Sequence, residues 1–276
     1  MSKSGNKTRL AKKLNISRGM LYYQPKRLAL DERVKALILS VLSHHPSYGH
    51  KRIALELKLN RKRILRVMRL YNLKPYRRRK TPFKPNDRGQ APMAYQNLIK
   101  DFCPIKANVV WVGDFTYLSF QGVWYYLATV MDLYTREILG WSLSNCHDLN
   151  LVQEAFDEAL KHEGVSPLYF HCDQGSEYAS ESYLNLIKDL KITVSMSRKS
   201  SPWENGFQES FYSNFKLDLG DLNRFSNLGE LMEGLSYQIN YYNRERIHTK
   251  LKMTPAKFRQ NHDVLVGEYL YKELGT

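Results

Sequence analysis

The stretch between residues 109 and 144 constrains the fold of this 276-residue chain more than any other part. Three of its segments are rich in Val, Trp, Tyr and Phe, with only short turns between them: Val109–Phe120, Val123–Leu133 and Arg136–Ser144. Aromatic and β-branched residues favour strands, and short connections favour hairpins. We therefore expect three antiparallel strands joined by hairpins.

The residues that follow alternate between helical and strand patterns. Apolar residues recur with helical spacing between Leu151 and Leu160. After them we expect a strand at Leu168–Cys172, a helix at about Glu181–Leu190, a strand at Ile192–Met196 and a helix from about Glu204. This order predicts an α/β domain over residues 108–262, in which helices flank a mixed five-stranded sheet.

Positive charge is concentrated in the first part of the chain. Residues 1–107 contain 27 Lys and Arg against 5 Asp and Glu, whereas the rest is mildly acidic and the whole chain carries +15. Such a basic region is typical of proteins that bind nucleic-acid phosphates, because each neutralised phosphate releases counterions. A solvated or RNA-binding tail is the alternative.

An all-α region is expected ahead of the sheet. Residues 1–30 predict a helix-turn-helix segment, with a turn at Asn15–Ser17 and with Leu10, Leu14 and Ile16 facing inward. Residues 31–74 predict a second helical, DNA-binding module. Its first helix should run from about Asp31 to His45 and a shorter one from near Tyr48 to Leu57.

The last helix of this module has the pattern of a recognition helix. Asn60 is a suitable N-cap, and the helix should run to about Asn72. One face carries cations and the opposite face is apolar, as a helix in the major groove requires. The candidate DNA contacts are Lys62, Arg63, Arg66 and Arg69, and the apolar residues are Ile64, Met68 and Tyr71. A basic surface helix without a DNA role is the alternative.

Residues 75–107 predict a basic, proline-containing linker. Five prolines exclude a regular helix, and the linker contains a run of cations: Arg77, Arg78, Arg79 and Lys80. We expect this run to cross DNA phosphates, although a basic tether without a fixed path is equally compatible with the pattern. Residues 263–276 are expected to be a C-terminal tail.

Several classes of protein are disfavoured by composition. No apolar run reaches the length of about 18 residues that a membrane helix needs, and the first residues lack the apolar core of a signal peptide. Cys103, Cys146 and Cys172 form no C-x-x-C pair, which argues against a disulfide framework or a zinc site. A soluble cytoplasmic protein without membrane contact is expected.

Two aspartates occupy the strand positions expected of a site. Alternation places Asp114 on the same side of its strand as Val112 and Thr116, where an ionised carboxylate is costly unless a cation compensates it. Hydrogen bonds from Thr116 or the backbone are the structural alternative. Asp173 follows a short apolar strand and precedes Gly175, although an Asx turn explains this pattern equally well.

Glu209 is the third candidate. In its helix Phe207, Phe211 and Phe215 form one stripe, and the opposite stripe is Asn205, Glu209, Tyr212 and Lys216. The Phe stripe should be core, and the polar stripe should point Glu209 toward whatever lies beside the sheet. A solvated helix face is the ordinary explanation of such a stripe.

The three acids together predict a metal site. Clustered carboxylates repel, and hard divalent cations are the usual remedy. Two Mg²⁺ ions about 4 Å apart, for which Mn²⁺ is expected to substitute, catalyse in-line phosphoryl transfer. The competing acids are Glu177 and Asp132. For Asp132 a role in bonding the amides of a turn is preferred.

Other polar residues near the catalytic helix are candidate supports or DNA contacts. Arg198 and Lys199 precede this helix and are placed to hold phosphates, unless they are simply solvent-exposed. Asn205 is expected to support Glu209, and Lys216 to contact DNA.

The same residues carry a resemblance to a known family. The runs WVGDFTY (Trp111 to Tyr117), HCDQGSEY (His171 to Tyr178) and SPWENGFQESF (Ser201 to Phe211) resemble those of bacterial insertion-sequence transposases, whose catalytic core is shared with retroviral integrases. Between Asp173 and Glu209 lie 35 residues, the spacing of the D,D-35-E family. The resemblance spans about residues 45–260.

This resemblance implies a ribonuclease H-like fold and a metal-dependent DNA transposase. The enzyme would cleave element ends and transfer a 3′-hydroxyl into target DNA. Implied partners are double-stranded DNA of the terminal inverted repeats and of the target, a second copy or more on paired ends, and an upstream-frame helix-turn-helix product, fused or bound. Bacterial cytoplasm, in association with the nucleoid, is the implied location. A DNA-binding regulator of transposition and a general ribonuclease H-like nuclease are the alternatives.

Overall fold

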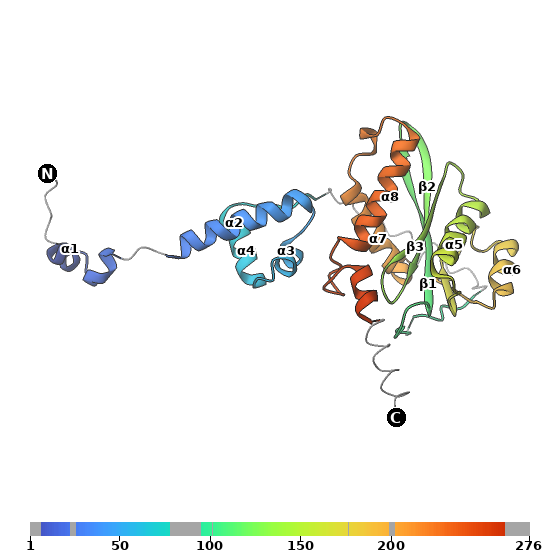
Figure 1. Ribbon diagram of the computed structural model, residues 1–276, viewed down its shortest axis with the longest axis horizontal. Coiled ribbons are helices and arrows are strands. Elements are labelled where there is room, and N and C mark those ends of the chain that lie inside the picture. The colour runs from blue at the N-terminus through green and yellow to red at the C-terminus, as the bar shows by residue number, and fades with distance from the viewer. Residues whose placement is uncertain are drawn as a thin grey trace, which may run out of the picture. The chain divides into compact units, whose positions relative to one another are not determined.

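The computed structural model describes residues 7–22, 26–77, 95–100, 102–175, 177–198 and 202–262. The chain divides into two compact units, Met1–Pro75 and Tyr76–Thr276, and each is described by itself (Figure 1). Several predicted features lie outside the described residues: the cations Arg78, Arg79, Lys80 and Lys199, and the tail 263–276.

The first unit is helical. Its elements are α1 (Lys7–Lys13), the 3-10 helix η1 (Arg18–Tyr22), α2 (Lys26–His44), α3 (His50–Glu56) and α4 (Arg61–Leu70). The side chain of Asn60 accepts a 2.8 Å hydrogen bond from the backbone amide of Lys62, which confirms the predicted N-cap. The apolar face of α4 packs into the core of this unit, where Ile64, Val67 and Met68 are buried.

Two expectations for this unit were wrong. Leu10 and Leu14 are exposed, at 47% and 54% of their surface, and Ala11 is the buried residue of α1. Helical spacing tells which side chains share a face, but not whether another element covers that face. The helix α2 also begins at Lys26 instead of Asp31, because residues 26–30 consist largely of strong helix formers.

The second unit contains the predicted mixed sheet. Its strands are β1 (Val110–Phe120), β2 (Val123–Asp132), β3 (Ile138–Ser144), β4 (Tyr169–Cys172) and β5 (Thr193–Met196). They lie in the order β3-β2-β1-β4-β5. The first three are antiparallel, and β4 and β5 run parallel to β1. The ladder between β1 and β4 ends at Val112 and His171, so most of β1 extends beyond β4.

Helices cover both faces of this sheet. They are α5 (Leu149–Glu163), α6 (Glu181–Asp189), α7 (Gly206–Leu219) and α8 (Leu228–Arg244), with two 3-10 turns, η2 (Pro202–Asn205) and η3 (Leu222–Arg224), and a last helix at residues 255–262. Helices α5 and α6 lie against one face, and α7 and α8 against the other (Figure 1). The sequence patterns did not predict α8.

The two faces bury separate cores. Trp111 on β1 packs against Phe156 of α5, whereas Leu118 on the same strand packs with Phe211 of α7. At Gly140 of β3, a Cβ atom would lie 2.2 Å from the backbone oxygen of Ala155, so only glycine lets α5 approach the sheet this closely. Burial of each large apolar side chain contributes about 1.5–3 kcal/mol.

Across the described parts of the chain, no helix combines the length and apolar character needed to span a membrane.

Candidate active site

Polar side chains of α7 fix this helix against the sheet. Gln208 is fully buried, and its amide donates a 2.7 Å hydrogen bond to the carbonyl of Val112. The hydroxyl of Tyr212 donates a 2.6 Å hydrogen bond to the backbone carbonyl of Asp114. It also lies 2.8 Å from the hydroxyl of Thr129 on β2. These bonds set the position of α7 along β1.

The buried face of α7 differs from the one expected. Phe211 and Phe215 are buried as predicted, but Phe207 is only half-buried. Tyr212 and Asn205, which were expected on the open polar face, are buried. The face turned to the sheet is rotated because backbone carbonyls of β1 and β2 accept hydrogen bonds there, and only polar side chains satisfy them.

Asp114 lies on the part of β1 that extends beyond β4. One carboxyl oxygen accepts a 2.8 Å hydrogen bond from the amide of Phe115. Burial, with a further contribution from the charges of Asp173 and Glu209, raises the pKa of Asp114 to about 8. The sequence-based expectation of a costly carboxylate at this strand position agrees with this raised pKa.

Asp173 directly follows the last residue of β4. Its carboxylate accepts a 3.0 Å hydrogen bond from the amide of Gly175, so the Asx turn proposed as the structural alternative is present. Burial raises the pKa of Asp173, and the charge of Glu177 adds to this effect. Asp173 therefore has a structural role in its turn and is also a carboxylate that is costly to ionise.

Glu209 lies in the first turn of α7 and is exposed. Its charge acts on Asp114, so a strand, a strand end and a helix bring three carboxylates into one electrostatic neighbourhood. Among the described residues, no group of three or more His, Cys, Asp and Glu side chains is arranged to hold a metal ion. The three acids are thus near one another without forming a closed set of ligands.

The donor set nevertheless fits a hard divalent cation. It consists of carboxylate oxygens, and the raised pKa of Asp114 identifies a place where added positive charge is favourable. The side-chain oxygen of Asn205, at the start of α7, is buried without a hydrogen-bond partner among the described residues. The supporting role expected of Asn205 stays a prediction.

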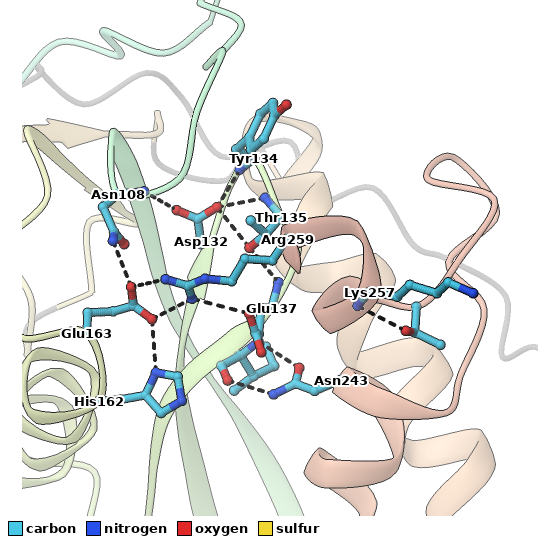
Figure 2. Close-up of polar contacts among 12 residues, drawn as sticks. Asn108, Asp132, Tyr134, Thr135, Glu137, His162, Glu163, Asn243, Lys257 and Arg259 are labelled. Carbon is cyan, nitrogen blue, oxygen red and sulfur yellow. Dashed lines mark hydrogen bonds and ion pairs between the residues drawn. The ribbon is translucent and has the colours of Figure 1, made fainter. Parts of the chain in front are cut away.

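The two competing acids have other partners. Glu177 is buried, and its carboxylate lies 2.5 Å from Nδ1 of His147. Asp132 accepts hydrogen bonds from the amides of Asn108, Tyr134 and Thr135, at 2.8, 2.9 and 2.7 Å (Figure 2). The predicted role of Asp132 in the turn after β2 is confirmed, and these bonds argue against a site built on Asp114, Asp132 and Asp173.

The candidate DNA contacts fall in different places. Lys62, Arg63 and Arg69 are on α4 in the first unit, and Arg66 of that helix is paired with Asp31. Arg77 is exposed. In the second unit the ammonium group of Lys216 donates a 2.7 Å hydrogen bond to the carbonyl of Tyr117, and Arg198 is exposed beside Glu204.

Glu204 is a residue that the sequence patterns did not single out. Its carboxylate accepts hydrogen bonds from the backbone amide of Arg198, at 2.7 Å, and from the side chain of Asn97, at 3.1 Å. It therefore links both ends of the loop before α7 to the segment around residue 97. Its place next to Asn205 in the SPWENGFQESF run was the available signal.

Fold and site together define a class. A mixed five-stranded sheet, with acids on its first strand, after its fourth strand and on a following helix, is the framework of the ribonuclease H-like polynucleotidyl transferases. A family model described as integrase core domain matches residues 104–202, and another with the same description matches residues 190–255.

Known proteins extend this match over most of the chain. It is 32% identical over 265 residues to the putative transposase InsK for insertion sequence element IS150 of Escherichia coli (strain K12), covering 91% of this chain and 92% of that protein. It is 34% identical over 242 residues to the transposase for insertion sequence element IS904 of Lactococcus lactis subsp. lactis (strain IL1403), covering 85% and 94%. The chain belongs to the insertion-sequence transposases with an integrase core.

A solved structure supports the fold. A chain of the simian T-cell lymphotropic virus intasome, in complex with PP2A regulatory subunit B56 gamma, aligns with a TM-score of 0.51 at 18% identity. The alignment covers 81% of this chain and 73% of that one. At this level of identity the likeness concerns the fold alone, and the predicted ribonuclease H-like fold is confirmed.

Proposed function

We propose that the chain cleaves DNA at the ends of its own insertion sequence and joins the freed 3′ ends to target DNA, with Asp114, Asp173 and Glu209 as the catalytic carboxylates. The observation that carries the proposal is the meeting of acids from a strand, a strand end and a helix: Asp114 is buried, and the charges of Asp173 and Glu209 add to the burial that raises its pKa. Acids that interact in this way around the central strand, in a chain of this family, are suited to hold cations.

The reaction balances without a covalent enzyme intermediate. Water attacks a phosphodiester at the element end and releases a 3′-hydroxyl. That hydroxyl then attacks a phosphodiester of the target, so one ester bond forms for each one broken. Joining therefore needs no external energy source.

Asp114, Asp173 and Glu209 would hold two Mg²⁺ ions, for which Mn²⁺ substitutes. When bound, such ions stabilise charge on the phosphoryl oxygens and activate the attacking oxygen. The protein supplies rigid placement: Asp114 is fixed by β1, Asp173 by its turn at Gly175, and Glu209 by the contacts of α7 with the sheet. Rigid placement of reacting groups accounts for a large share of catalysis in phosphoryl transfer.

Basic regions of the chain would bind the DNA. The first unit and the cation run that begins at Arg77 would bind the terminal inverted repeats, and Arg198, Lys199 and Lys216 would contact DNA near the acids. Two paired ends call for at least two copies of the chain. An upstream-frame helix-turn-helix product, fused or bound, would complete end recognition.

The test is strand joining with Mg²⁺ and a duplex that carries an inverted-repeat end of the element. Asp114→Asn, Asp173→Asn and Glu209→Gln should each lower joining by at least about 10³-fold, with DNA affinity within about twofold of wild type. Glu181→Gln, which changes an exposed acid at the start of α6, is the matched control and should join normally. Joining at the wild-type rate by any one of the three variants would remove that residue from the proposed site.

A further inference from the structure

A concave basic surface occurs within the first unit, between α2 and the beginning of α4. The groove has a volume of about 480 Å³. Its charged lining consists of four cations, Arg27, Lys62, Arg63 and Arg66, and a single acid, Asp31. The cations therefore exceed the acid by three charges within one concavity.

The acid in this groove fixes one of the cations. Asp31 is only 2% exposed, and its two oxygens accept hydrogen bonds from the two terminal nitrogens of Arg66, at 2.5 and 2.7 Å. Such a two-pronged pair holds a guanidinium in one orientation. The side chain of Arg66 stays 36% exposed, and a guanidinium has five N–H donors, so donors remain for a ligand in the groove.

The other three cations surround this fixed pair. Hydrogen bonds from Arg66 lower the pKa of Asp31, and the charges of Arg27 and Arg63 lower it further. In the described part of the chain, Arg27, Lys62 and Arg63 are in no ion pair. Their charges are therefore available to an anionic ligand.

We propose that this groove, formed by Arg27, Lys62, Arg63 and Arg66, binds a backbone phosphate of duplex DNA, and that Asp31 is a positioning residue for Arg66. The proposal rests on the proposed function, because a transposase must hold DNA. It assigns phosphate binding to side chains that helical spacing alone had suggested for reading bases in the major groove. Arg69, in the last turn of α4, lies outside the groove lining.

A phosphate fits this surface better than a base edge. Groups that read bases protrude from a helix into the groove of the DNA, whereas these cations converge on a concavity around a fixed guanidinium. A guanidinium held by a carboxylate offers a planar set of donors that matches phosphate oxygens. The contact would set the register of the first unit on the duplex, and it would be independent of sequence.

Fluorescence anisotropy of the full chain with two duplexes tests this inference. One duplex carries the element end and the other is unrelated, and both are titrated over a series of salt concentrations. Arg27→Ala, Lys62→Ala and Arg63→Ala should each weaken binding of both duplexes several-fold and lower the salt slope by up to about 0.9, the contribution of one phosphate. Arg61→Ala changes an exposed cation of the same helix outside the groove and should keep the wild-type slope.

Asp31→Asn separates positioning from charge. This variant loses one negative charge, so long-range attraction alone predicts tighter binding. If Asp31 positions Arg66, binding of both duplexes should instead weaken, in a protein whose thermal unfolding confirms that it is folded. Tighter binding by a folded Asp31→Asn variant would overturn the positioning role.

The remaining outcomes are distinct. Unchanged salt slopes for Lys62→Ala and Arg63→Ala would overturn the proposed phosphate site. A loss of affinity confined to the element-end duplex would also overturn it, because side chains that read bases would produce such a sequence-dependent loss. Another outcome is that the groove variants still bind DNA but lose affinity for a poly-glutamate probe that the wild-type chain binds. This outcome would indicate an acidic protein partner and would overturn the inference as well. If the wild-type chain showed no salt-dependent DNA binding, the proposed function itself would fail.

Discussion

The hydroxyl of Tyr212 lies 2.6 Å from the backbone carbonyl of Asp114, to which it donates a hydrogen bond. Tyr212 is on the helix that carries Glu209, and Asp114 is on the central strand. Because the hydrogen bond goes to the backbone of Asp114, it fixes α7 against β1 regardless of the rotamer of the aspartate side chain. The relative positions of two candidate catalytic acids thus depend on a neutral side chain between them.

Tyr212→Phe should disturb joining more than folding. The change removes one hydroxyl with little change of shape, and it should cost about 1 kcal/mol of unfolding free energy. We expect the joining rate at saturating DNA to fall about tenfold, which corresponds to about 1.4 kcal/mol in the barrier. Single-turnover joining and denaturant unfolding, measured on the same preparation, test this.

The matched control is Tyr237→Phe on α8, where the side chain is 66% exposed. Both quantities should be unchanged in that variant. A Tyr212→Phe protein that lost stability but joined at the wild-type rate would show that Tyr212 serves folding alone.

Asp114→Asn should stabilise the metal-free protein. The folded pKa of Asp114 is raised to about 8 by burial and by its acidic neighbours, from an ordinary value of 3.8. Between these two pH values the unfolded chain releases the proton and the folded chain retains it, so wild-type stability falls as pH rises from about 4 to about 8. A difference of one between the folded and unfolded pKa values corresponds to about 1.4 kcal/mol of stability.

The Asp114→Asn variant has no proton to release at this position, so its stability advantage over wild type should grow over this window and level off above it. Thermal unfolding at pH 5, 7 and 8.5 in chelator measures it, with Asp189→Asn, at an exposed site on α6, as the control. Mg²⁺ should then stabilise wild type more than Asp114→Asn. A variant less stable than wild type throughout the window would contradict the raised pKa.

Much of the fold follows from the sequence because its signals are local. Asn60 is a cap because its own side chain reaches the amide of Lys62. The strands β1 to β3 follow from aromatic and β-branched segments with short turns between them. Both kinds of signal depend on neighbours in the chain.

The remaining features depend on partners far away in the sequence. Arg66 has the spacing of a DNA contact, but only the folded unit pairs it with Asp31, which is 35 positions away. Tyr212 has the spacing of a polar residue on an open face, because periodicity does not reveal that a carbonyl of β1 faces it. Periodicity likewise gives no sign that Gln208 bonds to Val112. Motif spacing predicts the three proposed acids, whereas it gives no sign of the side chains that hold α7 against the sheet.

Asp132→Asn should destabilise the protein without removing catalysis. Its carboxylate accepts bonds from three backbone amides, and an asparagine side chain would turn its own donors toward one of them. An unmatched buried donor costs about 1–3 kcal/mol. Folded Asp132→Asn protein, assayed at low temperature, should join DNA at nearly the wild-type rate. Normal stability with abolished joining would move Asp132 into the catalytic set.

The last described helix is attached to the core by Arg259. Its guanidinium donates a 2.6 Å hydrogen bond to Glu163, a second bond to the other oxygen of that carboxylate, and a 3.3 Å bond to Glu137 (Figure 2). Burial would raise the pKa of Glu163, but hydrogen bonds from Arg259 and Asn108 outweigh it and lower that pKa. The pair therefore contributes stability above the ordinary value of 4.5, and the contribution is lost as pH falls through the lowered pKa.

Arg259→Ala should cost roughly 2–4 kcal/mol at neutral pH, because it leaves buried carboxylates without their partner. The difference from wild type should shrink below about pH 4.5, as Glu163 becomes protonated in both proteins. Denaturant unfolding at pH 7 and pH 4 measures this difference. The stability of Arg259→Lys should lie between those of wild type and Arg259→Ala, because lysine keeps the charge but not the two-pronged bond. A difference independent of pH would contradict the ionic origin of this attachment.

The proposed catalytic site depends most on which glutamate completes it. Glu209 and Glu177 both lie near the aspartates, and Glu177 is bound to His147. Strand joining by Glu209→Gln and Glu177→Gln, each checked for folding and for DNA affinity, compares them directly under Mg²⁺. We predict that Glu209→Gln abolishes joining and that folded Glu177→Gln retains at least a tenth of the wild-type rate. Joining by Glu209→Gln together with its loss in Glu177→Gln would contradict the proposed triad.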